Sequence, residues 1–248
     1  MQIFDIMDLI VYQAYYDKSQ LNHLDPAFTP YDNTLNAIPH LREYSFWKFL
    51  HGRHEKTNTH WGLVSWRWYE KTKISPSHFC DWMLNNPGYD VYHVDPFLDV
   101  TVSYINTWVQ GDIWHPGMLN FCDILFPKIG INVPVRNMIF KSDVFATCNY
   151  FVGNSKFWDE WLTYVDTILN ICFQDDNLYN YLYRDTAIYN NQRITNFSFV
   201  IERLFSNFLI SQKTLKVKKF PVEHISYRER FGSDHSKMVQ IYHEKNKL

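Results

Sequence analysis

Two cations, Arg67 and Lys71, follow an apolar, strand-like run within residues 60–72 (HWGLVSWRWYEKT). Guanidinium and ammonium groups bind phosphate oxygens, and ligands of α/β proteins lie where buried strands end. The segment therefore predicts a site for a phosphorylated ligand, with Arg67 and Lys71 as its cations. The alternative is that both are ordinary solvated charges at a strand end, as most charged side chains are.

Three more charged residues could serve a group transfer from such a ligand. Arg42 and Glu43 follow a long polar loop, where they can contact the ligand or pair with neighbours. Glu202 lies about 100° from Ile201 around a helix, at the edge of its apolar stripe, and can face a cleft while Arg203 points away. A carboxylate so placed can act as a general base. The alternative is a boundary glutamate that pairs with a nearby cation.

Residues 106–118 (NTWVQGDIWHPGM) combine two tryptophans with polar side chains. We expect Trp108 and Trp114 to bind an acceptor sugar, because flat aromatic faces pack against the C–H faces of sugar rings. Asp112 and His115 are the polar candidates for catalysis here, and His115 can also cap the following helix. Aromatic residues make up 18% of the chain, which fits either sugar platforms or a crowded core. Burial of the two tryptophans would remove the acceptor hypothesis.

The elements that must position these residues alternate between strands and helices. Apolar and β-branched runs predict strands over residues 10–16 and 61–69, and a short one within residues 86–97. Periodicity and cap residues predict helices from Pro39, after Ser75, near His115, from Asn154 or Ser155, and through residues 199–209. This order predicts an α/β fold with a mostly parallel central sheet flanked by helices on both faces.

Composition bears on domain number, partners and compartment. The 248 residues contain no Pro/Gly/Ser-rich linker, so we expect one domain over residues 1–248. The net charge of −2 creates no positive electrostatic potential that would attract nucleic acid. Four widely spaced cysteines are typical of reduced thiols, and the N-terminal sequence resembles neither a signal peptide nor a membrane span. We therefore predict a cytoplasmic protein with no transmembrane segment, which leaves peripheral association with the inner face of the membrane open.

Several short motifs carry a resemblance to a known family. They are N-x-x-P-x-x-R-E-Y-x-x-W-K (36–48), GL-x-x-x-R-x-Y (62–69), CNYFVGNSKFWDEW (148–161) and a late ERLFSNFL helix (202–209). Over residues 10–209 the chain resembles the uncharacterised glycosyltransferase-like domains of bacterial capsule and lipopolysaccharide gene clusters. The sequence departs from that family at Ser65-Trp66-Arg67-Trp68, where the family tends to carry His-Tyr-Arg-Arg.

The resemblance implies a GT-A-type fold and transfer of a sugar from a nucleotide donor to a glycan or lipid-linked acceptor. The resemblance implies that Asn36 and Ser65 also contact the donor, together with Arg42, Glu43, Arg67 and Lys71. Such enzymes commonly hold Mg²⁺ or Mn²⁺ with Asp-x-Asp, which this chain lacks. His93 and Asp95 share one face of an extended segment and are the nearest substitute, with His224 as a weaker third ligand. Metal-independent transfer is the alternative, as are structural roles for all three residues.

The leading hypothesis is a glycosyltransferase of bacterial surface polysaccharide synthesis. Its general base would be Glu202, with His115 and Asp112 as further catalytic candidates. One alternative is a non-catalytic carbohydrate-binding or scaffold domain of a polysaccharide-assembly system. Another is a nucleotidyl or phospho-sugar transferase. The sequence contains no GxSxG, Walker, GxGxxG or HExxH motif. It therefore lacks the motifs that are typical of serine hydrolases, ATPases and zinc proteases.

Overall fold

The computed structural model describes residues 7–35, 41–54, 58–189, 192–222, 241 and 244–246. Its strands are β1 (Leu9–Tyr15), β2 (Thr29–Asp32), β3 (His60–Ser65), β4 (Val91–His93), β5 (Phe151–Gly153), β6 (Thr186–Tyr189), β7 (Gln192–Thr195) and β8 (Val217–Lys219). Its α-helices are α1 (Arg42–His54), α2 (Trp68–Thr72), α3 (Pro76–Leu84), α4 (Leu98–Ser103), α5 (Thr107–Trp114), α6 (Met118–Lys128), α7 (Ser155–Phe173), α8 (Asp176–Tyr183) and α9 (Phe197–Ser211). Residues 18–23 and 135–137 form short 3₁₀ helices.

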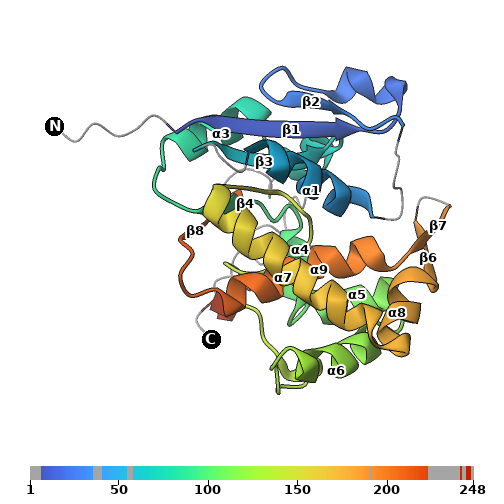
Figure 1. Cartoon of the computed structure of the whole chain (residues 1–248). Coiled ribbons are helices and arrows are strands. Elements are labelled where there is room, and N and C mark those ends of the chain that lie inside the picture. The colour runs from blue at the N-terminus through green and yellow to red at the C-terminus, as the bar shows by residue number, and fades with distance from the viewer. Residues whose placement is uncertain are drawn as a thin grey trace.

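The larger of two described sheets has the strand order β2-β1-β3-β5-β4-β8 (Figure 1). The β1–β2, β1–β3 and β4–β8 pairs are parallel, whereas β5 runs antiparallel to both of its neighbours. All strands of this sheet except β5 therefore point the same way. The smaller sheet is the antiparallel pair β6–β7. The prediction of an α/β fold with a mostly parallel sheet is confirmed.

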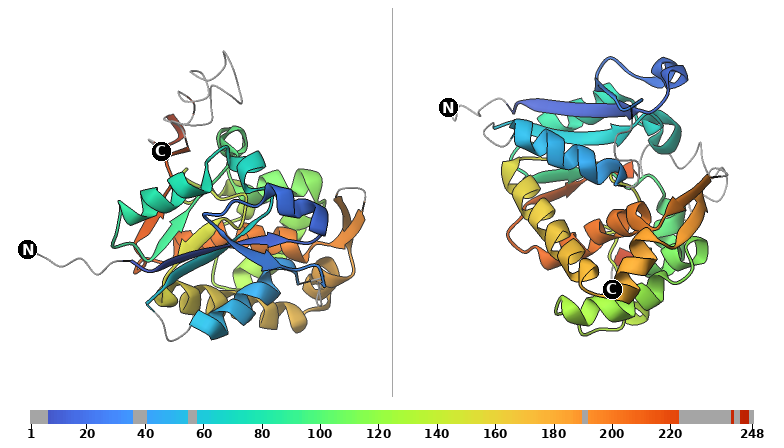
Figure 2. Two further views of the ribbon diagram at one scale, coloured as in Figure 1. Left: turned by 90° about the horizontal axis from the view of Figure 1, so that it is seen from above. Right: turned by 45° about the vertical axis from the view of Figure 1, so that its right-hand side comes forward.

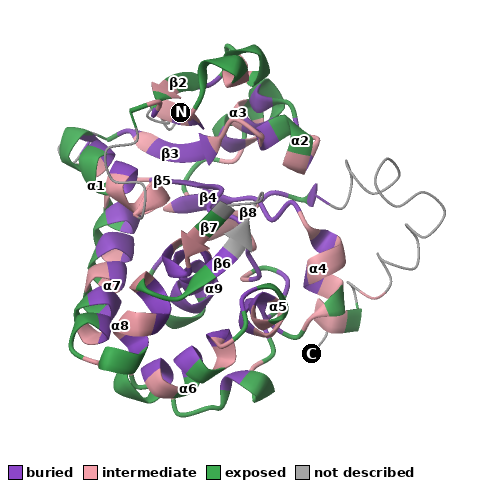
Figure 3. Cartoon of the chain, turned by 90° about the vertical axis from the view of Figure 1, so that its right-hand side faces the viewer, coloured by how far each residue is buried: buried purple, intermediate pink, exposed green. Residues whose placement is uncertain are grey.

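Both faces of the large sheet are buried, because its central strands alternate between two hydrophobic clusters. Trp61, Leu63 and Phe151 point into the cluster that contains α1, α7 and α9. Val64 and Val152 point into the other, which contains side chains of α2 and α3. A period of two with apolar side chains on both faces is the pattern of a strand covered on each side. Figure 2 shows helices on either side of this sheet, and Figure 3 shows burial concentrated in its central strands and in α9.

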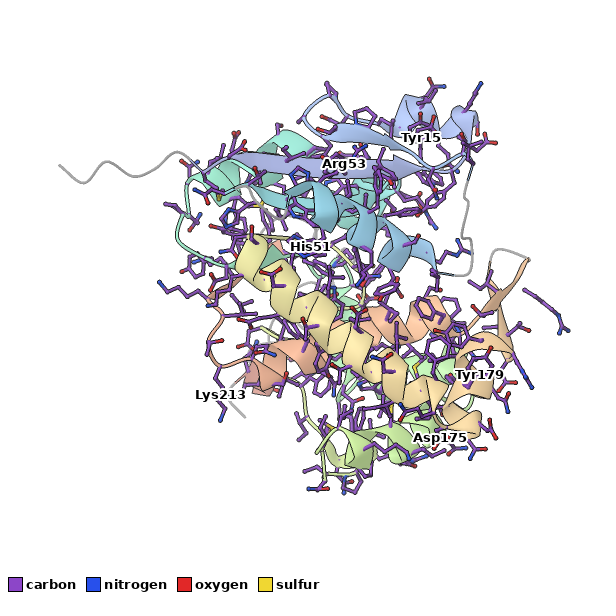
Figure 4. The ribbon with its side chains drawn as sticks, viewed as in Figure 1. Tyr15, His51, Arg53, Asp175, Tyr179 and Lys213 are labelled. Carbon is purple, nitrogen blue, oxygen red and sulfur yellow. The ribbon has the colours of Figure 1, made fainter. Side chains whose placement is uncertain are left out.

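The N-terminal part of helix α7 packs on one face of the sheet, and the helix then runs on towards α8 (Figure 1). Asn154 caps it by accepting a hydrogen bond from the Phe157 amide, one of the two caps that the sequence predicted. Trp158 stacks on Trp61 of β3, with ring centroids 3.8 Å apart and planes 5° from parallel. His51 of α1 lies 3.1 Å from Asp159, which ties α1 to the outer side of α7 (Figure 4). No helix among the described residues is long and apolar enough to cross a membrane.

Two predicted element boundaries were wrong. The strand expected over residues 61–69 ends at Ser65, and Trp68 begins the short helix α2. Trp68 is completely buried, and its indole nitrogen donates to the carbonyl of Ile74. The helix expected near His115 begins instead at Met118, after Gly117 with a φ of 94°. Aromatic residues fit strands and helices alike, so their pattern alone did not locate the first boundary.

Gly62 of β3 is required by close packing against β5. A Cβ atom there would lie 2.3 Å from the carbonyl oxygen of Phe151 and 2.7 Å from a Val152 methyl group. We expect Gly62→Ala to lower the free energy of unfolding by about 1–3 kcal/mol through overpacking. Gly52 is the matched control, since it lies in α1 and a Cβ atom there would meet nothing within 4 Å. Gly52→Ala should stabilise the protein by up to about 1 kcal/mol. Urea denaturation followed by circular dichroism measures both, and equal effects would contradict the packing argument.

Candidate functional site

A cavity with a volume of about 760 Å³ lies at the carboxyl ends of β1 and β3. Six charged side chains line it: Arg42, Glu43, Arg67, Glu70, Lys71 and Glu202. Volumes of a few hundred to about 1,000 Å³ are typical of small-ligand and cofactor sites. Of the residues predicted from the sequence, the cavity gathers Arg42, Glu43, Ser65, Arg67, Lys71, Trp114, His115 and Glu202.

Strand order explains why a crevice forms here. From β1 the chain proceeds to β2 on one side, and from β3 it proceeds through α2 and α3 towards β4 on the other. Adjacent parallel strands whose connections leave in opposite directions create a crevice outside their carboxyl ends. Tyr16, which follows β1, and Trp66, which follows β3, both line the cavity. Tyr16 could not be recognised from the sequence as a site residue, because only the pairing of β1 with β3 brings it to the cavity.

Lys71 and Arg67 face the same cavity but have different partners. The Lys71 ammonium lies 3.8 Å from the Cys148 sulfur and 5.6 Å from the centre of the Tyr150 ring. Arg67 donates through two nitrogens to the carboxylate of Glu70, an i,i+3 pair in which both side chains are partly exposed. Such a pair contributes at most about 1 kcal/mol, so a doubly charged phosphate group can compete with Glu70 for the guanidinium.

Glu202 lies on α9 and lines the cavity. Its side chain is 27% exposed to solvent. Burial raises the pKa of Glu202 to about 7, although nearby Lys71 lowers it. The neighbouring Arg203 is almost fully buried and donates to the carbonyls of Thr107 and Phe199 and to the side-chain oxygen of Gln110. Arg203 thus points away from the cavity, into the contact between α9 and α5.

Trp114 and His115 form another part of the cavity wall, at the end of α5. Trp114 is 67% exposed, so its ring is available to a ligand. The His115 imidazole stacks on Phe199 of α9, with centroids 3.5 Å apart. Burial, with a smaller contribution from Arg203, lowers the pKa of His115 to about 4. His115 is therefore neutral at pH 7 and a weak base, although it can still hydrogen-bond a ligand.

Trp108 and Asp112, also on α5, have structural positions. Trp108 is completely buried and its indole nitrogen donates to Asn207 of α9. The expectation that Trp108 stacks on a sugar is wrong in this structure, because no face of its ring is open. Asp112 does not line the cavity; its carboxylate accepts a hydrogen bond from the amide of Leu119 in the first turn of α6. Both residues help to hold α5 against its neighbours.

His93 and Asp95 bond to protein groups instead of facing an open space. His93 is fully buried next to the carbonyl of Asp143, and burial lowers its pKa to about 3. Asp95 accepts hydrogen bonds from the hydroxyls of Thr101 and Thr147 and lies 3.8 Å from the ammonium of Lys219. In the described ranges, no three His, Cys, Asp or Glu side chains are grouped so that they could hold a metal ion. The two residues therefore do not form the predicted cation site.

Two predicted residues, Asn36 and His224, lie outside the described residues. Ser65 is described at the carboxyl end of β3, where its hydroxyl lies 2.8 Å from that of Tyr150. This hydrogen bond joins the ends of β3 and β5 beneath the cavity.

Comparison with family models, with curated proteins and with solved structures found no match to this chain.

The raised pKa of Glu202 makes a prediction about stability and pH. Folded protein binds this proton more tightly than unfolded protein does, so stability is lost as the pH rises from about 4.5 to about 7. Glu202→Gln should therefore raise the free energy of unfolding at pH 8, by at most about 3 kcal/mol, and much less at pH 5.

Glu70→Gln is the matched control on the same cavity. Hydrogen bonding to Arg67 lowers the pKa of Glu70, so this variant should be no more stable than the native protein at either pH. Thermal melts at pH 5 and pH 8 make the comparison. A Glu202→Gln protein that melts at the native temperature at pH 8 would contradict the assignment of Glu202 as a destabilising, buried carboxylate.

Proposed function

We propose that this protein is a glycosyltransferase that transfers a sugar from a nucleotide-activated donor to a hydroxyl group of a glycan or lipid-linked acceptor. The observation that carries this proposal is the joint presence of cations and a carboxylate of raised pKa in one cavity at the carboxyl edge of the sheet. Lys71 and Arg67 supply the positive charge and Glu202 the carboxylate. A mostly parallel sheet with its cavity at that edge is compatible with the GT-A-type fold that the sequence resemblance implies.

The cations suit the leaving group of such a transfer. When the bond between the anomeric carbon and the diphosphate oxygen breaks, negative charge develops on the departing diphosphate. Lys71 can stabilise it as a point charge, and Arg67 can bind it through two nitrogens after leaving Glu70. Arg42 adds a third positive charge to the lining of the same cavity.

Glu202 suits the acceptor side of the reaction. As general base it would take the proton of the acceptor hydroxyl while that oxygen forms the new bond to the anomeric carbon. A base is most useful when its pKa lies near the working pH, and the value of about 7 meets that condition. Trp114 offers the exposed aromatic face against which an acceptor sugar can pack.

No reaction step in this proposal passes through a metal ion. Carboxylates are the charged oxygen ligands that could hold Mg²⁺ or Mn²⁺ here, and three such side chains, from Glu43, Glu70 and Glu202, line the cavity. They share it with Arg42, Arg67 and Lys71, whose charges oppose a divalent cation. We propose that these cations take over the charge stabilisation that a metal ion would provide.

The donor site can be tested with Lys71→Gln, because this change removes the charge and keeps much of the side chain. We expect it to weaken the binding of a nucleoside diphosphate by about 10- to 100-fold, since charge-assisted hydrogen bonds contribute about 1.5–3 kcal/mol. Arg67→Gln should have a smaller effect, because binding must first displace Glu70. Isothermal titration calorimetry with UDP, GDP and ADP gives the dissociation constants.

Lys73→Gln provides the matched control. Lys73 lies two residues from Lys71 and carries the same charge, but it does not line the main cavity. It lines a neighbouring one, which shares Trp66, Arg67 and Glu70 with the main cavity. Its replacement should leave nucleotide affinity within about twofold of the native value. Equal losses in both variants, or no nucleotide binding by the native protein, would contradict the proposed donor site. Binding of oligosaccharides alone would favour a carbohydrate-binding or scaffold domain instead.

A further inference from the structure

A small chamber lies at the inner end of the cavity, beneath Lys71 and Glu202. Its volume is about 30 Å³. Some residues line both the chamber and the main cavity, among them Tyr16, Glu43, Ser65, Lys71 and Glu202. Asn149 and Tyr150 line the chamber and not the main cavity. We call this space the inner chamber. A ligand that fills the main cavity can reach it with one small substituent.

Asn149 is the polar group of the inner chamber that the fold leaves unsatisfied. Only 5% of the residue is exposed, and neither buried amide atom has a hydrogen-bond partner among the described residues. Leaving a buried amide unpaired costs about 1–3 kcal/mol, and nearly all such groups in folded proteins are paired. When a residue lines a chamber and its buried amide has no protein partner, we infer that a ligand group supplies the missing hydrogen bonds.

Three further polar side chains of the inner chamber, those of Ser65, Tyr150 and Lys71, have neighbours in the protein. The hydroxyls of Ser65 and Tyr150 lie 2.8 Å apart and bond to each other. Burial raises the pKa of Tyr150 well above its usual value, so its hydroxyl stays neutral at any physiological pH. The ammonium of Lys71 lies near the Cys148 sulfur and faces the main cavity as well. Asn149 is therefore the residue whose hydrogen bonds a ligand would provide.

The size and chemistry of the inner chamber select the ligand group. With a volume of about 30 Å³, the inner chamber suits a group the size of a water molecule, such as a hydroxyl, better than a larger acetamido group. An amide donates through its nitrogen and accepts through its oxygen, which matches a hydroxyl that both accepts and donates. The carboxylates of Glu43 and Glu202 line the same space and oppose a negatively charged substituent.

We propose that the inner chamber receives one hydroxyl group of the donor sugar, held by the amide of Asn149. The donor is therefore a neutral sugar with a free hydroxyl at that position, and not an N-acetylated or acidic one there. This inference rests on the proposed function, because it takes the ligand of the main cavity to be a nucleotide sugar. Asn149 thus determines which sugar binds, whereas Lys71 and Arg67 hold the diphosphate.

The test is a double-mutant cycle between Asn149 and the hydroxyl groups of the sugar. Affinities of the native protein and of Asn149→Ala are measured by calorimetry for UDP, UDP-glucose, UDP-galactose, GDP-mannose and UDP-N-acetylglucosamine. The sugar nucleotide that binds most tightly is then compared with its monodeoxy analogues. For one analogue we expect a loss of about 10- to 100-fold in the native protein and almost none in Asn149→Ala, because a site built to pair a hydroxyl rejects a ligand that lacks it. UDP itself should bind both proteins equally.

The outcomes separate the inference from the proposed function. If a nucleoside diphosphate binds but every deoxy analogue loses the same affinity in both proteins, the inner chamber proposal is wrong and the donor site stands. Tighter binding of the N-acetylated sugar nucleotide than of the unsubstituted ones would also overturn the proposal. If no nucleoside diphosphate or sugar nucleotide binds the native protein, both proposals are overturned.

A stability control shows whether Asn149 supports the fold instead of a ligand. Replacing an unpaired amide should not lower the melting temperature, so Asn149→Ala should melt at or above the native temperature without ligand. Asn106 is the matched comparison, since its buried amide donates to the carbonyls of Val135 and Met138 and accepts from the amide of Val109. Asn106→Ala should lower the melting temperature by several degrees. An equal drop in Asn149→Ala would contradict the proposal, and the deoxy analogues can still be compared in the native protein.

Discussion

The site depends on how Arg203 is held in the contact between α9 and α5. Its guanidinium is buried, and it donates to the carbonyls of Thr107 and Phe199 and to the side chain of Gln110. The guanidinium also lies 3.9 Å from the carboxylate of Glu202. Turning α9 about its axis would take these neutral partners from a buried cation, at a cost of about 1.5–3 kcal/mol for each hydrogen bond, so the rotation of the helix is fixed. Because successive helix residues lie about 100° apart, fixing Arg203 inward turns Glu202 towards the cavity. Trp108, bonded to Asn207, adds a second tie between the same helices.

The segment of residues 145–150 forms another part of the wall around the cavity and the inner chamber, and polar side chains hold it in place. Ser206 of α9 bonds to both backbone groups of Ala146, and Asp95 accepts from Thr147. Tyr150 bonds to Ser65 at the end of β3. These contacts place Cys148 and Asn149 beside the cavity from a stretch that is neither helix nor strand. Asp95, whose carboxylate we expected to bind a metal ion, instead positions this wall.

Local patterns predicted much of the fold because the rules that govern them are local. The Ser75 cap with Pro76 after it, and the long apolar stripe that begins after Asn154, each depend on residues within a few turns. Strand alternation likewise predicted β1, within one residue of each end. The end of β3 was missed because Trp66 and Trp68 carry no preference that separates a strand from a turn followed by a helix.

The candidate site was predicted less completely than the fold. Arg67 and Lys71 line the cavity, as expected for side chains that directly follow a central strand, and the edge position of Glu202 on its apolar stripe correctly predicted that it faces a cleft. Trp108 is buried against α9, where it bonds to Asn207, 99 positions away in the sequence. Asn149 and Lys71 line the same chamber although they are also far apart in the sequence. No local pattern contains such contacts, so the fold had to be known first.

The central claim is that Lys71 and its neighbours hold a diphosphate at the carboxyl edge of the sheet. A crystal structure of the protein with the nucleoside diphosphate that binds most tightly tests it most directly. The account predicts that phosphate oxygens lie within hydrogen-bond distance of the Lys71 ammonium, with Arg67 turned from Glu70 towards the ligand. A diphosphate bound elsewhere on the protein, with this cavity empty, would contradict the account.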